Sequence, residues 1–205
     1  MTVKVEFLFD FGSPNAYLAE VAIAGIEQRT GVKFDYVPVL LGGIYKATGN
    51  MSPFESLRGI KNKPEYQALE TQRFIRRHGI VKFRSNPFFP VNTLMLMRAA
   101  TGYGMHQPDR LQTYLAAVFD AIWVQGLNLG DPSVVGKVLT GVGLDADQVL
   151  AWCSDADVKA QLKNTTDEAV RRGVFGAPTC FVGDEMFFGQ DRLDFIRAAL
   201  QEPQA

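Results

Sequence analysis

The stretch that decides the fold lies near the N-terminus and reads Phe9-Asp10-Phe11-Gly12-Ser13-Pro14-Asn15-Ala16-Tyr17. Before it, bulky side chains alternate over residues 3–9, as in a β-strand with one buried face. After it, apolar residues recur at helical spacing up to residue 26. Gly12 permits a tight turn, Ser13 is a preferred N-cap residue, and Pro14 suits a first helical turn. We therefore predict a strand followed directly by a helix that begins at Ser13.

The start of this helix is suited to holding an anion. The first-turn N–H groups have no partner within the helix, and the helix dipole favours negative charge at this end. In a functional interpretation, the Ser13 hydroxyl and these N–H groups face a ligand. In the structural alternative, Ser13 only caps a helix that follows an edge strand. The motif by itself leaves both interpretations open.

A second informative stretch lies near the C-terminus. Two short apolar runs, 179–182 and 186–188, flank Gly183-Asp184-Glu185 and predict a β-hairpin. Pro178 stands just before the first of these strands, where it removes no ladder hydrogen bond. We predict a cis peptide bond before Pro178, which would expose the Ala177 backbone to a ligand.

A last helix is predicted to follow this hairpin. Gly189-Gln190-Asp191-Arg192 marks its start, with Asp191 as the expected N-cap. Between the two motifs, helical periodicity predominates, with the clearest helix at 111–123 and others expected at 64–78, from Asp131-Pro132 onward, and at 155–172. Residues 84–90, rich in Pro and Phe, are expected to form a loop.

Composition narrows the class of protein. The chain has 205 residues, is 47% hydrophobic and carries a net charge of −1, so it is long enough for one ordinary core and shows no basic footprint for nucleic acid or anionic membrane. No apolar run reaches transmembrane length, and residues 1–20 lack the pattern of a secretory signal, which predicts a cytoplasmic protein. Two histidines and two cysteines, not clustered in sequence, predict no metal site.

Together the two motifs outline a thioredoxin-type fold without the usual dithiol. Ser13-Pro14-Asn15-Ala16 occupies the place of Cys-x-x-Cys, so disulfide exchange is excluded at this site. From about residue 4 to about residue 200, the chain resembles the glutathione-dependent 2-hydroxychromene-2-carboxylate isomerases, which are relatives of the kappa-class glutathione transferases and of DsbA oxidoreductases. The most specific matches are Phe9–Pro14, Val174–Thr179 and Gly183–Arg192.

The resemblance implies an α/β fold in which a thioredoxin-like domain receives a large all-helical insertion. We expect residues 1–42 and 172–205 to form the thioredoxin-like domain and residues 43–171 to form the insertion. A cleft between the two parts is where a small ligand is expected to bind. Relatives of this kind are typically homodimers, so a homodimer is expected here as well.

Glutathione is the cofactor that the resemblance implies. Without a Gly-x-Ser-x-Gly elbow or a triad readable from the sequence, Ser13 is better suited to donate a hydrogen bond to a ligand thiolate than to act as a nucleophile. In the related proteins, the serine matching Ser13 lies beside the glutathione sulfur, and the residue matching Ala177, before Pro178, pairs with the peptide backbone. Positions matching Gly189, Gln190 and Asp191 hold the γ-glutamyl end. Asn50 matches an asparagine near glutathione, although Gly49-Asn50 also fits a plain turn.

The reaction implied is a cis–trans isomerisation of an aromatic keto acid by reversible thiolate addition. Substrate positions of the family fall near Tyr45, Lys46, Arg58 and Phe88. Either Lys46 or Arg58 would pair with the substrate carboxylate, and Phe88 would stack on its ring, together with Phe89. Two alternatives stay open: a kappa-type glutathione transferase that releases a conjugate, and a non-catalytic thioredoxin-like binding module.

Overall fold

The computed structural model describes residues 4–201, so Val3, the first residue of the predicted strand, lies outside the described part. A four-stranded sheet has the order β2-β1-β3-β4. β1 (Val5–Phe9) is parallel to β2 (Phe34–Pro38) and antiparallel to β3 (Thr179–Val182), which forms a hairpin with β4 (Glu185–Phe188). The two ends of the chain therefore meet in one sheet, as the fold class requires.

The first helix, α1 (Pro14–Thr30), begins and ends where local sequence predicts. The Ser13 side chain accepts a hydrogen bond from the Ala16 N–H, and Pro14 occupies the first turn. Gly31 ends the helix with φ of 71°, a left-handed conformation in which glycine has no steric penalty. The predicted N-cap at Ser13 is thus confirmed.

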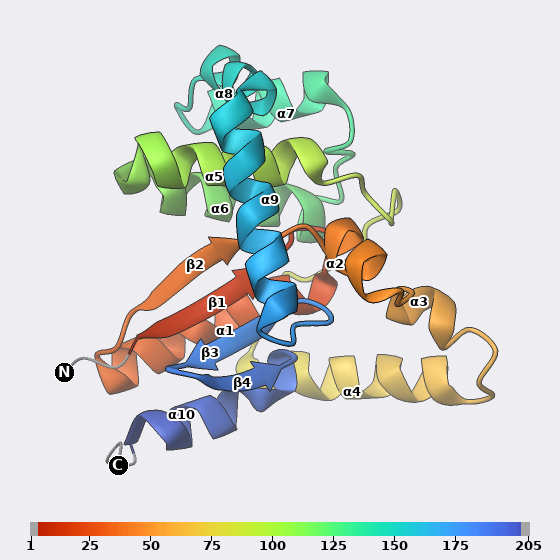
Figure 1. Ribbon diagram of the computed structural model, residues 1–205. Coiled ribbons are helices and arrows are strands. Elements are labelled where there is room, and N and C mark those ends of the chain that lie inside the picture. Colours follow the sequence, from red (N-terminus) through yellow and green to blue (C-terminus); the bar gives the residue numbers. More distant parts are fainter. Residues whose placement is uncertain (1–3, 202–205) are drawn as a thin grey trace.

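An apolar core lies on each face of the sheet, so the side chains of β1 are buried on both faces. Phe7 and Phe9 point into the larger core with α1, α5 (Leu94–His106) and α6 (Pro108–Trp123). Leu8 points to the opposite face, where a smaller core includes Ile44 and Ala169. These two residues belong to α2 (Leu41–Thr48) and α9 (Ala156–Arg171), so helices cover both faces of the sheet (Figure 1).

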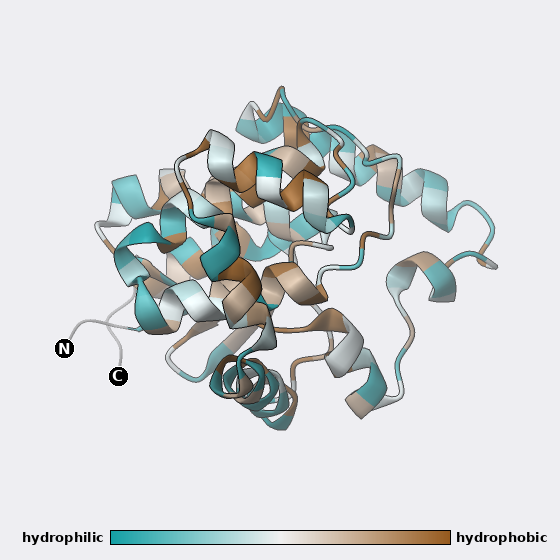
Figure 2. Cartoon of the chain, turned by 90° about the horizontal axis from the view of Figure 1, so that it is seen from above, coloured by the Kyte–Doolittle hydropathy of each residue, from teal (hydrophilic) through white to brown (hydrophobic). Residues whose placement is uncertain are grey.

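The remaining helices form a lobe on one side of the sheet and an extension on the other. α5 and α6 lie beside the sheet, α7 (Pro132–Gly141) and α8 (Ala146–Ser154) lie beyond them, and α9 returns from α8 across the sheet (Figure 1). Seen from above, hydrophobic segments concentrate where these helices meet, and hydrophilic segments lie outside (Figure 2). The predicted helices and the 84–90 loop are confirmed. Among the described residues, no helix is both long enough and apolar enough to cross a membrane.

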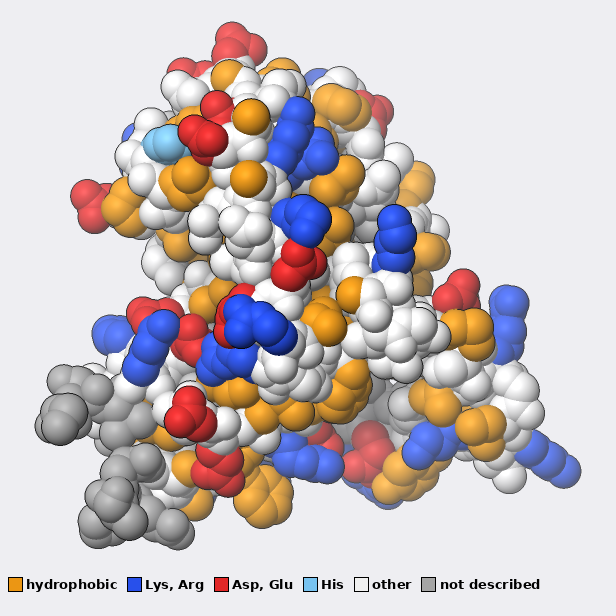
Figure 3. All heavy atoms as spheres, in the orientation of Figure 1, with side chains coloured by type: hydrophobic (Ala, Val, Ile, Leu, Met, Phe, Trp, Pro, Cys, Tyr) orange, Lys and Arg blue, Asp and Glu red, His pale blue; other side chains and the backbone are white. Residues whose placement is uncertain are grey.

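The extension consists of α3 (Pro53–Ser56) and the part of α4 (Lys63–His78) that precedes Phe74, and we call residues 53–73 the arm. Its residues are almost all exposed, and Phe74 is the first buried side chain of α4. Large apolar side chains are nevertheless present on it, namely Phe54, Ile60, Tyr66 and Leu69. The arm projects from the body and leaves a hollow in the surface between α2 and α4 (Figure 3).

Candidate active site

The hydroxyl of Ser13 connects the two sequence motifs, because it belongs to the first and bonds to the second. Its Oγ accepts a hydrogen bond from the Ala16 N–H at 3.2 Å and donates one to the Ala177 carbonyl oxygen at 2.9 Å. Ser13 is only 6% exposed, and Ala177 is buried as well. The contact joins residues 164 positions apart and lies where β1 ends and β3 is about to begin.

The segment from Ala177 to Gly189 adds backbone groups to the same place. The Ala177–Pro178 peptide bond is cis, which confirms the prediction. The Pro178 carbonyl accepts a hydrogen bond from the Gly189 N–H at 2.9 Å, and Gly189 has φ of 99°. Ser13, Ala177, Pro178 and Gly189 therefore form one contiguous set, in which only Ser13 contributes a functional side chain.

Asp10 holds together the segments around Ser13 through hydrogen bonds. The sequence analysis did not predict this role. Its carboxylate accepts hydrogen bonds from the Gly12 N–H at 2.9 Å, the Thr93 hydroxyl at 2.7 Å and the Leu41 N–H at 2.9 Å. Asp10 is 1% exposed, and burial raises its pKa while these three donors act in the opposite direction. An acidic residue between two buried aromatic residues, just before a Gly-Ser turn, was the available signal.

An aromatic series runs from the core toward the arm. The indole N–H of Trp123 donates to the Phe11 carbonyl at 2.9 Å, and the Phe89 ring lies 6.1 Å from Trp123. Phe54 then contacts Phe89 edge-on at 5.7 Å between ring centroids. Arg58 lies over the Phe54 ring at 5.7 Å. These contacts join the interior beneath the Ser13 turn to the arm.

The predicted substrate residues differ in how well they fit this arrangement. Arg58 belongs to the aromatic series, whereas Phe88, 52% exposed, has its backbone N–H bonded to Asn86 and makes no ring contact with a described residue. Phe89, 37% exposed, makes the ring contacts instead, and Phe54 was missed by the sequence interpretation.

Three other predicted residues, Tyr45, Lys46 and Asn50, lie on α2 or just after it and do not belong to the aromatic series. Tyr45 is half-buried, and burial raises the pKa of its hydroxyl, with smaller contributions from Asp10 and Glu55. Lys46 is exposed and forms no ion pair within residues 4–201. Asn50 is exposed just after Gly49, which ends α2 in a left-handed conformation, as a plain turn would.

Gln190 and Asp191 follow Gly189 in the chain and line a cavity that contains none of Ser13, Ala177, Pro178 and Gly189. They face α4 across this cavity of about 210 Å³, which also contacts Arg73 and Arg77. The predicted N-cap at Asp191 is wrong, because Gln190–Arg192 form a 3₁₀ turn, η1, before α10 (Leu193–Gln201). Asp191 is inside that turn, and its carboxylate pairs with Arg192 at 2.6 Å.

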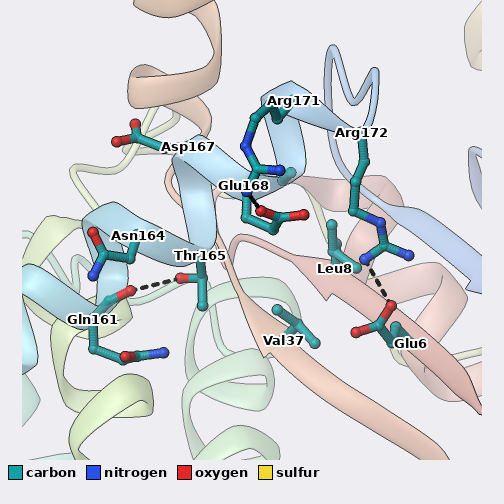
Figure 4. A pocket seen from close by; sticks show the side chains of 11 residues that line it. Glu6, Leu8, Val37, Gln161, Asn164, Thr165, Asp167, Glu168, Arg171 and Arg172 are labelled. Carbon is teal, nitrogen blue, oxygen red and sulfur yellow. Dashed lines mark hydrogen bonds and ion pairs between the residues drawn. The ribbon is translucent and has the colours of Figure 1, made fainter.

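Another cavity, of about 480 Å³, lies between α9 and the sheet and contains none of the predicted site residues (Figure 4). Its two arginines each pair with an acidic side chain of the same cavity. Arg172 bonds to Glu6 at 2.7 Å, and Arg171 pairs with Glu168. With these charges mutually neutralised, this cavity offers no unpaired arginine to an anionic ligand.

Neither cysteine substitutes for a catalytic thiol. Both are free, and Cys180 is buried in β3, where burial raises the pKa of its thiol to about 12. The Cys153 thiol donates to the Met95 carbonyl in the helical lobe. Within the described residues, no group of three or more His, Cys, Asp or Glu side chains is placed to hold a metal ion.

Comparisons with known proteins identify the family of this chain. The DSBA-like thioredoxin domain family matches residues 4–201. The 2-hydroxychromene-2-carboxylate isomerase of Sphingobium xenophagum is 31% identical over 98% of this chain and 99% of its own length. A solved 2-hydroxychromene-2-carboxylate isomerase superposes with a TM-score of 0.81 at 29% identity, covering 96% of this chain and 93% of its own.

A more distant relative is human glutathione S-transferase kappa 1, which is 24% identical over 97% of this chain and 91% of its own length. The match to the isomerase is therefore stronger, at similar coverage of this chain and greater coverage of the relative. The chain belongs to the DSBA-like thioredoxin domain family and groups within it with the 2-hydroxychromene-2-carboxylate isomerases.

Proposed function

We propose that this chain is a glutathione-dependent isomerase of aromatic hydrocarbon catabolism. It interconverts 2-hydroxychromene-2-carboxylate and aryl keto acids of the trans-o-hydroxybenzylidenepyruvate type. The observation that carries the proposal is the Ser13 hydroxyl, which caps α1 and lies 2.9 Å from the carbonyl of the residue before Pro178. The proposal is also supported by sequence, since this chain is 31% identical over nearly its whole length to a 2-hydroxychromene-2-carboxylate isomerase.

The groups around Ser13 suit glutathione. The chain has no thiol in the Ser13–Ala16 turn, so the thiol comes from a ligand, and the start of α1 favours a negative charge. We assign Ser13 to the sulfur, the Ala177–Pro178 backbone to the cysteinyl group, and Gly189, Gln190 and Asp191 to the γ-glutamyl end. Asn50 is proposed as a further contact. Bound glutathione supplies a thiolate that adds reversibly to the substrate double bond, so that rotation becomes possible.

The residues of this chain orient the substrate beside that thiolate. Its ring is proposed to lie against Phe54 and Phe89, with Phe88 and Tyr45 at the edges of the pocket. Its carboxylate pairs with Arg58, which presents two N–H donors in one plane, in preference to Lys46. Apart from Asn50, the helical residues 43–171 thereby provide the substrate side of the site, and the thioredoxin-like part provides the cofactor side.

We also propose that the enzyme is a cytoplasmic homodimer. Two free cysteines without a disulfide fit a reducing compartment. The exposed apolar side chains Ile60, Tyr66 and Leu69 of the arm support association with a second copy, since apolar side chains exposed together mark protein–protein interfaces.

A glutathione transferase is the second candidate, supported by the match to the kappa class. The two functions differ in what becomes of the thiol. An isomerase returns glutathione unchanged, whereas a transferase consumes it stoichiometrically.

Incubation with 2-hydroxychromene-2-carboxylate and a limiting amount of glutathione separates these functions. We expect spectral conversion to the equilibrium mixture with the trans product over many turnovers per glutathione, no conversion without thiol, and an undiminished thiol titre afterwards. A stable glutathione adduct in mass spectra, with matching loss of thiol, would establish the transferase instead. Conversion in the absence of any thiol would exclude both.

A further inference from the structure

The single proton of the Ser13 hydroxyl is already engaged in this structure. Ser13 Oγ accepts from the Ala16 N–H at 3.2 Å and donates to the Ala177 carbonyl at 2.9 Å. A hydroxyl has only one proton to donate. In this arrangement, Ser13 therefore has no donor left for an anion at the start of α1.

In Ala177, only one of the two backbone polar groups has a hydrogen-bond partner among the described residues. This residue lies just beyond Leu8–Thr179, the last residue pair between β1 and β3. Its carbonyl accepts from Ser13, while its N–H has no hydrogen-bond partner within residues 4–201. A peptide that pairs with Ala177 as an added strand would use both backbone groups, and its amide N–H would compete with Ser13 for the carbonyl.

We propose that the Ala177 carbonyl holds the Ser13 proton until the amide N–H of a cysteinyl peptide replaces it. Stabilisation of the ligand thiolate is thereby coupled to backbone pairing. This inference rests on the proposed role of glutathione. Ser13 Oγ stays held by Ala16, and only its O–H bond turns, about Cβ–Oγ, from the carbonyl toward the sulfur. Ser13 keeps its proton throughout, and the proton of the ligand thiol passes to solvent.

The coupling has a physical reason. If Ser13 turned away with no replacement, the buried Ala177 carbonyl would be left without a donor, which is unfavourable. A peptide N–H at Ala177 removes that cost. It follows that Ser13 favours a peptide ligand that carries a thiolate, and disfavours one that pairs with Ala177 but carries no sulfur.

The test measures the dissociation constants of glutathione and of γ-glutamyl-alanyl-glycine for the wild type and Ser13→Ala by calorimetry. Ser13→Ala is expected to bind glutathione several-fold more weakly and the alanyl peptide several-fold more tightly. The ultraviolet thiolate band of bound glutathione should titrate about one pH unit higher in the variant, since a hydrogen bond to a charged group has been removed.

Asp145→Ala serves as the control, because it removes the N-cap of α8 in the helical lobe and should leave both dissociation constants unchanged. A role of Ser13 as a helix cap alone would weaken both ligands together. Parallel weakening, or an unchanged affinity for the alanyl peptide, would overturn the coupling but leave glutathione binding intact. Failure of the wild type to bind glutathione at all would overturn the proposed function as well.

Discussion

Arg58 and Lys46 are both exposed cations, but only Arg58 lies over an aromatic ring. Its guanidinium is held near Phe54, so less freedom is lost when it pairs with a carboxylate. We expect Arg58→Lys to raise KM for the chromene carboxylate about tenfold, the loss of roughly one charge-assisted hydrogen bond. Lys46→Met should change KM less than twofold. Steady-state kinetics at saturating glutathione measure both, and a larger effect at Lys46 would reverse the assignment.

Glu20 of α1 is a residue whose charge opposes folding. Burial raises its pKa from 4.5 to about 7, and it accepts no hydrogen bond from another described residue. The folded-state pKa lies above the unfolded one, so the folded protein binds this proton more tightly than the unfolded chain does. The stability that the protonated carboxyl group gives is fully present below about pH 4.5 and is lost as pH rises through 7. Glu20→Gln should therefore stabilise the protein at pH 8 and flatten the pH dependence in that window. Urea unfolding across pH tests this, with the exposed Glu185→Gln as control.

At the scale of elements, the Asp10 carboxylate connects the β1–α1 turn, the start of α2 and the start of α5 through Gly12, Leu41 and Thr93. These elements carry Ser13, Tyr45 and the end of the Phe88–Phe89 loop. The candidate site is therefore assembled around a buried acidic side chain that joins three elements through its hydrogen bonds.

Asp10→Asn is expected to destabilise the protein by about 1–3 kcal/mol, because one amide can accept on a single oxygen and its NH₂ group would face the Leu41 N–H or another donor. kcat/KM should fall as well, since α2 loses its tie to the β1–α1 turn. Urea unfolding and steady-state kinetics measure the two effects. The exposed Asp35→Asn of β2 is the matched control, and equal behaviour of the two variants would refute this role for Asp10.

For the whole molecule, the arm is notable because its apolar side chains are not covered by any other part of the described chain. Tyr66 and Leu69 are exposed on α4, whose first buried side chain is Phe74. We expect the wild type to sediment as a dimer and a Tyr66→Glu, Leu69→Glu variant to sediment as a folded monomer, because buried charge opposes association. Val81→Glu, at an exposed apolar residue outside the arm, should leave the dimer intact. A monomeric wild type would contradict the proposal.

Local sequence was sufficient for the features whose causes lie within a few residues. The cap at Ser13, the end of α1 at Gly31 and the hairpin at 179–188 follow from short-range hydrogen bonds and backbone preferences. Asp191 shows the limit of this reasoning. A cap and a 3₁₀ turn use similar residues, and the choice between them depended on how η1 packs beside α1 and α10.

The sequence by itself determined where α1 starts, that no thiol lies there, and that a proline begins the last hairpin. Only the tertiary structure decided that Ser13 donates to Ala177, that Asp10 binds Leu41 and Thr93, and that Phe89 contacts Phe54. The reason is the range of the interactions. Each of these contacts joins segments brought together by the pairing of β1 with β2 and β3 or by the packing of the helices, and no spacing within one segment encodes them.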